Sequence, residues 1–218
     1  MNRVCAKDYF PFRFKIAAEL ESAFATNVIR RDPMKRIGIL LCVLIFLTGC
    51  SSKLSQMDRA MSLRTKLLAK PATFDAEITA DYGDKTYTFQ MQCGVDTQGN
   101  LTFAVVQPEV ISGITGTVSS GGGKLTFDDT ALAFDLMADG QLSPVSGPWI
   151  LMRGLRSGYL SSSTQEGDLY RIAVDDSYED DALHLEVWLD SSDAPVAAEV
   201  YWQGRRLLTI TVRNFTFV

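Results

Sequence analysis

The pattern of apolar residues changes period once along the main part of the chain. Up to Lys70 the apolar residues recur at near-helical spacing, and Pro71 then ends this pattern. These residues are Leu54, Met57, Met61, Leu67 and Leu68. From Thr73 onward, apolar and polar positions alternate in runs that Gly, Asp, Asn and Ser interrupt. The first pattern predicts an amphipathic helix, and the second is typical of β-strands.

The strand-like runs fall into two groups with a short helical segment between them. The first group covers 74–80, 87–91, 101–106, 124–127 and 131–136; the second covers 169–174, 183–189, 197–202 and 207–217. Short turns connect neighbouring runs, which predicts antiparallel pairing. After a proline-rich break at 144–148, the segment 149–156 returns to helical spacing. The predicted fold class is α+β, with an antiparallel sheet whose one face is covered by two helices.

A short apolar run near the N-terminus follows the basic pair at 35–36 and ends in Leu47-Thr48-Gly49-Cys50. The run is close to half of the about twenty residues that a membrane-spanning helix needs, and it has the length of a signal-peptide core. Its end resembles the lipobox of bacterial lipoproteins, in which small residues precede a cysteine that takes the lipid. The resemblance implies cleavage between Gly49 and Cys50 and a diacylglyceryl thioether on Cys50, with a further acyl chain such as palmitate.

This motif divides the chain into three parts. Residues 34–49 are the predicted signal peptide, and residues 50–218 form a single lipid-anchored domain. Residues 1–33 precede a complete signal peptide, so we interpret them as an extension that is absent from the mature protein, whether translation starts at Met1 or at Met34. A short tether over 51–53 is expected to hold the domain close to the extracytoplasmic face of a membrane in the cell envelope.

Charge and cysteine content narrow the function of the mature part. Of 21 basic and 26 acidic residues, 8 and 4 precede Cys50, which leaves a net charge of about −9. An acidic surface repels phosphate, so we expect no nucleic-acid binding and no polybasic contact with lipid headgroups. Cys93 is the only cysteine after Cys50, which excludes an internal disulfide framework and a cysteine metal site.

The candidate catalytic groups are few. His184 alternates with Leu183 and Leu185, which predicts a surface histidine on the polar face of a strand. Cys93 lies in a strand run without a second histidine, so a half-buried, unreactive thiol is expected. We therefore predict no enzymatic activity.

Three charged segments are weighed against ligand binding. The acidic stretch 175–181 lacks the EF-hand glycine and predicts a solvated turn. The run 121–124 lacks the spacing of a phosphate loop and predicts a hairpin turn. Arg205 and Arg206 follow a turn and are typical of solvated residues at a strand edge. No metal and no cofactor other than the lipid on Cys50 is expected.

Three sequence segments resemble the LolA/LolB-like lipoprotein-localisation superfamily, which includes RseB-like sensor domains. They are 103–108, 132–140 and 195–204, taken with the order of elements and the lipid anchor. The resemblance implies a strongly curved, incomplete antiparallel β-barrel, closed by helices over an apolar cavity that holds acyl chains in several members. The soluble carriers of that superfamily are not lipidated, so this chain is closer to a membrane-bound acceptor or a sensor.

The helical segment 149–156 is the candidate ligand site. Trp149, Leu151, Met152 and Leu155 can form a lid over a lipid cavity, or they can simply fill the core beneath the sheet. The predicted function is that of a monomeric envelope lipoprotein that binds an acyl chain or a lipidated ligand in a concave cavity. The alternative is a sensor or assembly module that binds a protein or a cell-wall partner through its outer face.

Overall fold

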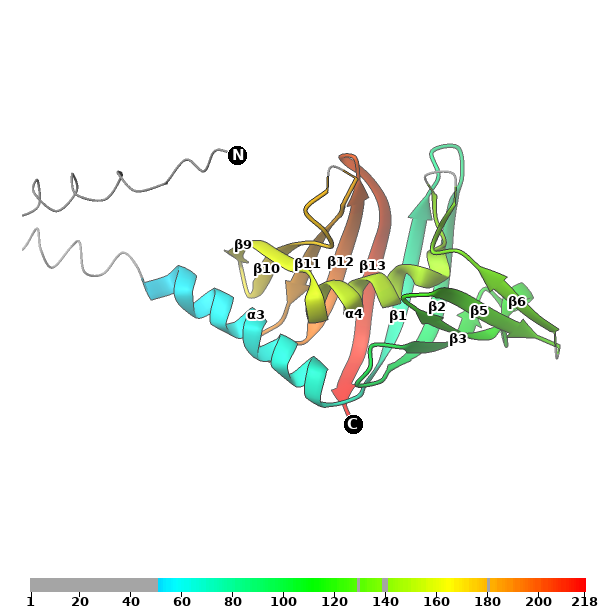
Figure 1. Ribbon diagram of the computed structural model, residues 1–218, viewed down its shortest axis with the longest axis horizontal. Helices are drawn as coiled ribbons and strands as arrows, with labels where there is room; N and C mark the ends of the chain where they lie inside the picture. The colour runs from blue at the N-terminus through cyan, green and yellow to red at the C-terminus, as the bar shows by residue number, and fades with distance from the viewer. Residues whose placement is uncertain (1–50, 129, 139–140, 180) are drawn as a thin grey trace, which may run out of the picture. The chain divides into compact units, whose positions relative to one another are not determined.

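The computed structural model describes residues 51–128, 130–138, 141–179 and 181–218. Eleven antiparallel strands form one open sheet, and two helices lie on one of its faces (Figure 1). The helices are α3 (Ser51–Ala69) and α4 (Gly147–Ser157). The sheet strands are β1 (Ala72–Asp81), β2 (Thr86–Val95), β3 (Leu101–Gln107), β4 (Thr115–Ser119), β5 (Gly122–Phe127), β6 (Thr130–Phe134), β9 (Tyr159–Glu166), β10 (Leu169–Asp175), β11 (Leu183–Leu189), β12 (Pro195–Trp202) and β13 (Arg205–Phe217).

The strand order shows two meanders joined in the middle of the sheet. The order is β6-β5-β4-β3-β2-β1-β13-β12-β11-β10-β9, so β1 pairs with the last strand, β13. The chain leaves the sheet at one edge, β6, and returns at the opposite edge, β9. The link between these edges contains the hairpin of β7 (Met137–Ala138) and β8 (Gln141–Leu142) and then α4. It therefore has to cross the face of the sheet.

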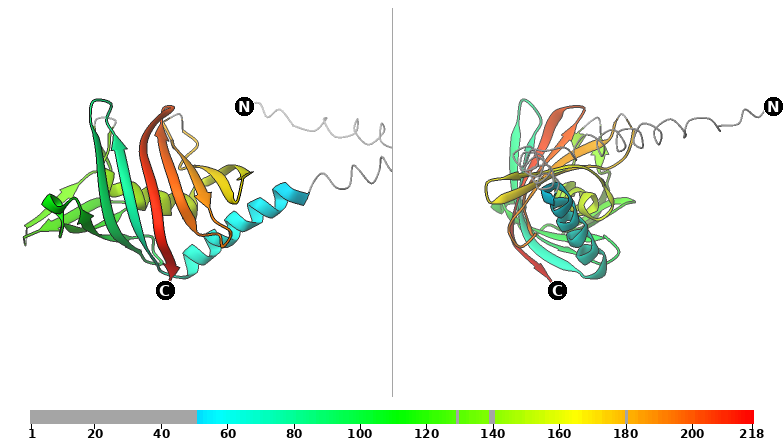
Figure 2. Two further views of the ribbon diagram at one scale, coloured as in Figure 1. Left: turned by 180° about the vertical axis from the view of Figure 1, so that it is seen from behind. Right: turned by 90° about the vertical axis from the view of Figure 1, so that its left-hand side faces the viewer.

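The predicted α+β class and the curved, incomplete barrel are confirmed. Figure 2 shows the sheet curving around the helices, and the sheet stays open because β6 and β9 are its two edges. Two strands of this sheet, β4 and β9, were not predicted, nor was the short hairpin of β7 and β8. The tether expected over 51–53 is wrong, since α3 begins at Ser51. The signal peptide and Cys50 lie outside the described residues.

Helix α4 lies against the concave face at very short distance. A Cβ added to Gly147 would lie 3.2 Å from Leu208 Cδ1 in β13, and one added to Gly154 would lie 3.0 Å from Leu185 Cδ2 in β11. Eight of the eleven residues of α4 are buried. A helix that is apolar on nearly all sides is a core helix rather than a surface helix. The glycines explain how it can approach the sheet so closely.

Helix α3 is held to the second meander by an arginine. The Nε of Arg59 donates to Asp193 in the β11–β12 turn at 2.5 Å, and its guanidinium lies 3.6 Å from the ring centroid of Tyr170 in β10. On its buried side, α3 contributes Ala60, Leu63 and Leu67 to the core. The helix predicted over 54–70 is thus confirmed, and its apolar face packs on the domain.

The two helices cap each other through arginines. Arg64 of α3 donates from Nε to the carbonyl of Leu155 at 3.0 Å and from a terminal nitrogen to that of Gly158 at 2.6 Å. Arg156 of α4 donates to the carbonyl of Leu67 near the end of α3. The last carbonyls of a helix have no partner within it and carry partial negative charge, which a guanidinium offsets. Each helix end is therefore completed by the other helix.

Within the described ranges, no helix has both the length and the hydrophobicity that crossing a membrane requires.

Removing either capping arginine should destabilise the domain. Arg64→Met and Arg156→Met keep an aliphatic side chain but leave helix carbonyls without a donor, so each should lower the free energy of unfolding by about 1.5–3 kcal/mol. Lys66→Met, on the exposed side of α3, is the matched control and should change it by less than about 0.5 kcal/mol. Urea unfolding measures all three. Equal midpoints for the arginine variants and the control would show that the caps contribute nothing.

Candidate functional site

The four residues predicted to line a ligand cavity are packed in the core. Trp149, Leu151, Met152 and Leu155 are each at most 3% exposed. They lie between α4 and the sheet, as the core-packing interpretation expects. Trp149 also donates its indole N–H to the carbonyl of Gly99 at 3.0 Å and borders a small hollow of about 270 Å³ near the end of α3. A ligand beneath α4 would have to displace these side chains.

The apolar inner face of the sheet continues beyond the cover of α4. Directly paired residues lie on the same face, and one row runs across the first meander from Phe74 through Cys93, Phe103 and Leu125 to Leu132. The first three are buried, at 3–5% exposed; Leu125 is half-buried and Leu132 is 58% exposed. The same apolar surface is thus core at one end of the row and open at the other.

We name this uncovered surface the open strip and define it as Leu125, Phe127, Leu132 and Phe134. Its members alternate along β5 and β6 on the inner face. Phe127 is 45% exposed, and Phe134 is half-buried against the core. The strands that carry the strip lie at the far end of the sheet from β9 (Figure 1). Exposed apolar side chains on one face make the strip a candidate binding surface.

Glycines opposite aromatic rings shape the strip. A Cβ on Gly123 would collide with the ring of Phe134, its direct partner in β6. A Cβ on Gly116 would lie 2.6 Å from the ring of Phe103 and 2.5 Å from the carbonyl of Lys124. Each ring lies over the bare backbone of its partner strand. Both rings can therefore lie close to the sheet, because glycine leaves room for them.

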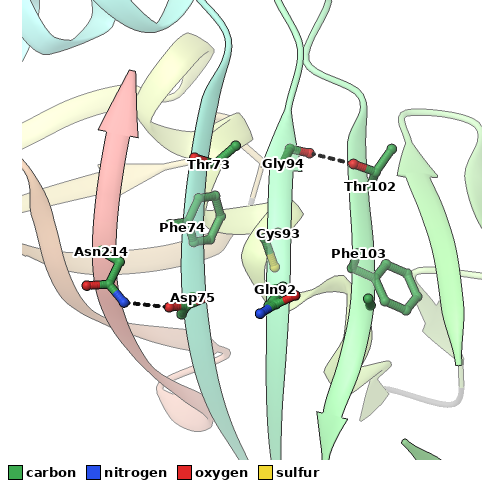
Figure 3. Close-up of a pocket in the computed structure, with 10 residues that line it drawn as sticks. Thr73, Phe74, Asp75, Gln92, Cys93, Gly94, Thr102, Phe103 and Asn214 are labelled. Atoms are coloured by element: carbon green, nitrogen blue, oxygen red, sulfur yellow. Dashed lines mark hydrogen bonds between the residues drawn. The ribbon is translucent and has the colours of Figure 1, made fainter. Parts of the chain in front are cut away.

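The outer face of the sheet carries a polar hollow of about 550 Å³ across β13, β1, β2 and β3 (Figure 3). The small residues Gly94 and Ala104 lie among longer polar ones, which leaves the space. Asn214 sits at a register shift in β13 with φ of 54° and donates from Nδ2 to Asp75 Oδ2 at 2.6 Å. Gln92 faces them from β2. Hydroxyl, amide and carboxylate groups line this hollow together with apolar atoms, so it offers hydrogen bonds beside apolar contact.

A second hollow of about 220 Å³ adjoins the first and shares Asp75 and Gln92 with it. In this hollow Glu77 accepts from Arg213 at 3.3 Å and from Gln90 at 3.2 Å. The outer face therefore offers an ion pair at Glu77 and a carboxylate, Asp75, that is bonded to the neutral amide of Asn214.

The candidate catalytic residues lie where the sequence predicts them. His184 is partly exposed on the polar face of β11, and its Nδ1 lies 2.6 Å from the carboxylate of Asp175. Cys93 is more deeply buried than expected, at 5% exposed. Burial raises the pKa of the Cys93 thiol far above its ordinary value. A thiol in that state is a weak nucleophile.

The basic pair at 205–206 and the run 121–124, both weighed above against ligand binding, have structural roles within the fold. Arg206 pairs with Glu199 at 2.6 Å, and Arg205 donates to the carbonyl of Asp81 at 3.1 Å. The run 121–124 forms the β4–β5 turn and the start of β5. Among the described residues, no group of three or more His, Cys, Asp or Glu side chains is arranged to hold a metal ion.

Comparisons with known proteins give matches among solved structures alone. No family model matches the chain, and no curated protein matches it either. The chain is similar to an uncharacterised conserved protein from Thermus thermophilus, at 9% identity over 74% of this chain and 87% of that one, with a TM-score of 0.44. It is also similar to a LolA superfamily protein from Nitrosomonas europaea, at 11% identity over 73% and 93% of the two chains, with a TM-score of 0.40.

A third similar structure is the lipoprotein LppX from Mycobacterium tuberculosis, at 10% identity over 74% of this chain and 93% of that one, with a TM-score of 0.36. The Nitrosomonas europaea structure belongs to the superfamily whose resemblance the sequence suggested. These are similarities of fold.

The sequence could not identify the open strip. The residues of β5 and β6 alternate as any half-buried strand does, and only the position of α4 decides which of them stay uncovered. The signal that was available is the apolar content of 131–134, which is high for a strand next to two aspartates.

Proposed function

We propose that this chain is a lipid-anchored envelope protein that binds an acyl chain or a lipidated ligand on the open strip, without catalysis. The observation that carries the proposal is the continuity of the strip with the core. The inner-face residues of the row are buried at its Phe74 end, whereas Phe127 is 45% exposed and Leu132 is 58% exposed. An acyl chain laid on these residues would bury surface that the fold itself leaves exposed.

The energetics favour a ligand that is presented at a membrane. Burying about six methylene groups on an open surface contributes roughly 5 kcal/mol at about 0.8 kcal/mol each, which corresponds to a dissociation constant between about 0.1 and 1 mM. A soluble ligand at micromolar concentration would leave such a site empty. An anchor on Cys50 would hold the domain where acyl chains are concentrated, which compensates for the weak contact.

The alternative function is a sensor or assembly module that binds through the outer face. The polar hollow around Asp75, Gln92 and Asn214 favours it, because that face carries hydrogen-bonding groups and no covering helix. Its ligand would be polar, such as a wall polymer or a protein surface. The two proposals use opposite faces of the sheet, so variants separate them.

Charge placed on the open strip should abolish acyl-chain binding. Leu132→Glu puts a carboxylate on the inner face, where burying it under an acyl chain is costly. Ala131→Glu puts the same charge on the outer face of the same strand and is the matched control. Titration with a short-chain fluorescent fatty acid into the low millimolar range should show binding to the native protein and to Ala131→Glu, with at least a tenfold weaker response for Leu132→Glu.

Equal binding by both variants would contradict the proposal, as would absence of binding to the native protein. Unfolding midpoints measured in parallel separate a lost site from a lost fold. A response that falls only when Gln92 or Asn214 is replaced would favour the outer face instead.

The anchor is tested separately. Cys50→Ala should remove incorporation of an alkyne-tagged palmitate and leave a larger, uncut precursor on a gel, because a lipobox without cysteine is neither lipidated nor cut by a lipoprotein signal peptidase. A Cys93→Ala variant should keep both the label and the mature size. Palmitate incorporation that survives Cys50→Ala would overturn the proposed anchor.

A further inference from the structure

The two edges of the sheet are built differently. Strand β9 forms one edge and is mostly polar, with the run Ser-Ser-Ser-Thr-Gln-Glu, and its pairing with β10 is interrupted by a register shift. Strand β6 forms the other edge and reads Thr-Ala-Leu-Ala-Phe, with four of its five residues exposed and its register unbroken. Proteins protect exposed edges with charges, prolines or bulges, because unpaired backbone groups recruit other strands. Edge β9 has such protection and edge β6 does not.

The backbone of β6 is positioned to accept a strand. A two-residue connection that includes Asp128, at φ of 44°, joins it to β5, and all five of its residues pair in sequence. In a hairpin of this length the closing pair, Phe127 and Thr130, is hydrogen-bonded, and the bonded pairs then alternate. Ala131 and Ala133 therefore direct their N–H and C=O groups away from β5, toward solvent.

The charges at the ends of β6 indicate whether a docking strand comes from a second copy of this chain or from another protein. Asp128 and Asp135 flank β6, and no basic residue lies within it. Two copies of β6 in full antiparallel overlap would bring these aspartates of both chains beside one another at both ends, and like charges across a sheet are destabilising. A strand with basic residues at its ends would instead meet an acidic residue at each end.

We infer that β6 is a docking edge for an extended polypeptide strand of another protein, apolar at alternate positions and flanked by lysine or arginine. The strand would extend the sheet by main-chain hydrogen bonds to Ala131 and Ala133, and its inward side chains would lie next to Leu132 of the open strip. This mode of recognition is β-strand addition. It differs from acyl-chain binding because it uses the edge of the sheet, although the docked strand would border the open strip at Leu132.

The test uses the full chain in nanodiscs and a fluorescein-labelled peptide, Lys-Val-Thr-Val-Thr-Val-Lys. Fluorescence anisotropy should show saturable binding. The same peptide with alternate backbone amides methylated should bind about thirtyfold more weakly, because two main-chain hydrogen bonds are lost. Ala133→Pro should weaken binding of the unmethylated peptide about fivefold, since it removes one outward N–H. Gln165→Pro, at an outward position of edge β9, is the matched control and should leave binding unchanged.

A variant with an exchanged charge distinguishes the loss of the docking edge from a failure to fold. Asp135→Lys should weaken binding of the lysine-flanked peptide and strengthen binding of the same peptide flanked by aspartate. Absence of binding to the native protein, equal binding of the methylated peptide, or equal effects of the two proline variants would overturn the inference. Self-association of the native chain that Ala133→Pro abolishes would also overturn it, because the occupant of the edge would then be a second copy.

Discussion

The fold depends on one topological constraint: the chain leaves the sheet at edge β6 and has to return at the opposite edge, β9. The link between them crosses the concave face, and its crossing element, α4, becomes the core. A buried crossing helix needs close approach, which Gly147 and Gly154 permit, and it needs its last carbonyls completed, which Arg64 of α3 provides. The mutual capping of α3 and α4 thus fixes the element on which both halves of the sheet pack.

The same constraint explains where binding surface is left. The helix lies against β13, β11 and β10 and reaches β2 of the first meander, so its cover is centred on the middle of the sheet. The distal strands of the first meander, β5 and β6, keep the apolar alternation of a core strand but have no helix above them. An uncovered face and an unprotected edge then occur on the same hairpin. We interpret both as consequences of one short helix covering a wide sheet.

Much of this architecture could be predicted from the sequence, for physical reasons that also show the limits. Helix α4 is predictable because its apolar residues recur at helical spacing between prolines and glycines. Strands β4 and β9 were not predicted because their runs, Thr-Gly-Thr-Val-Ser and Tyr-Leu-Ser-Ser-Ser-Thr-Gln-Glu, hold few apolar residues at period two. The sequence did not decide whether Met152 lies in a lid over a cavity or in the core. Its burial depends on the distance between α4 and the sheet. That distance is a tertiary property.

The proposed function requires that an acyl chain lies on the open strip and not beneath α4. Photo-crosslinking of the full chain with a diazirine-bearing fatty acid, followed by peptide mapping with mass spectrometry, locates the bound chain. We predict adducts in the segment 122–134, centred on Phe127 and Leu132. Adducts concentrated on Trp149 and Met152 would contradict this prediction and would show that α4 moves to admit the ligand.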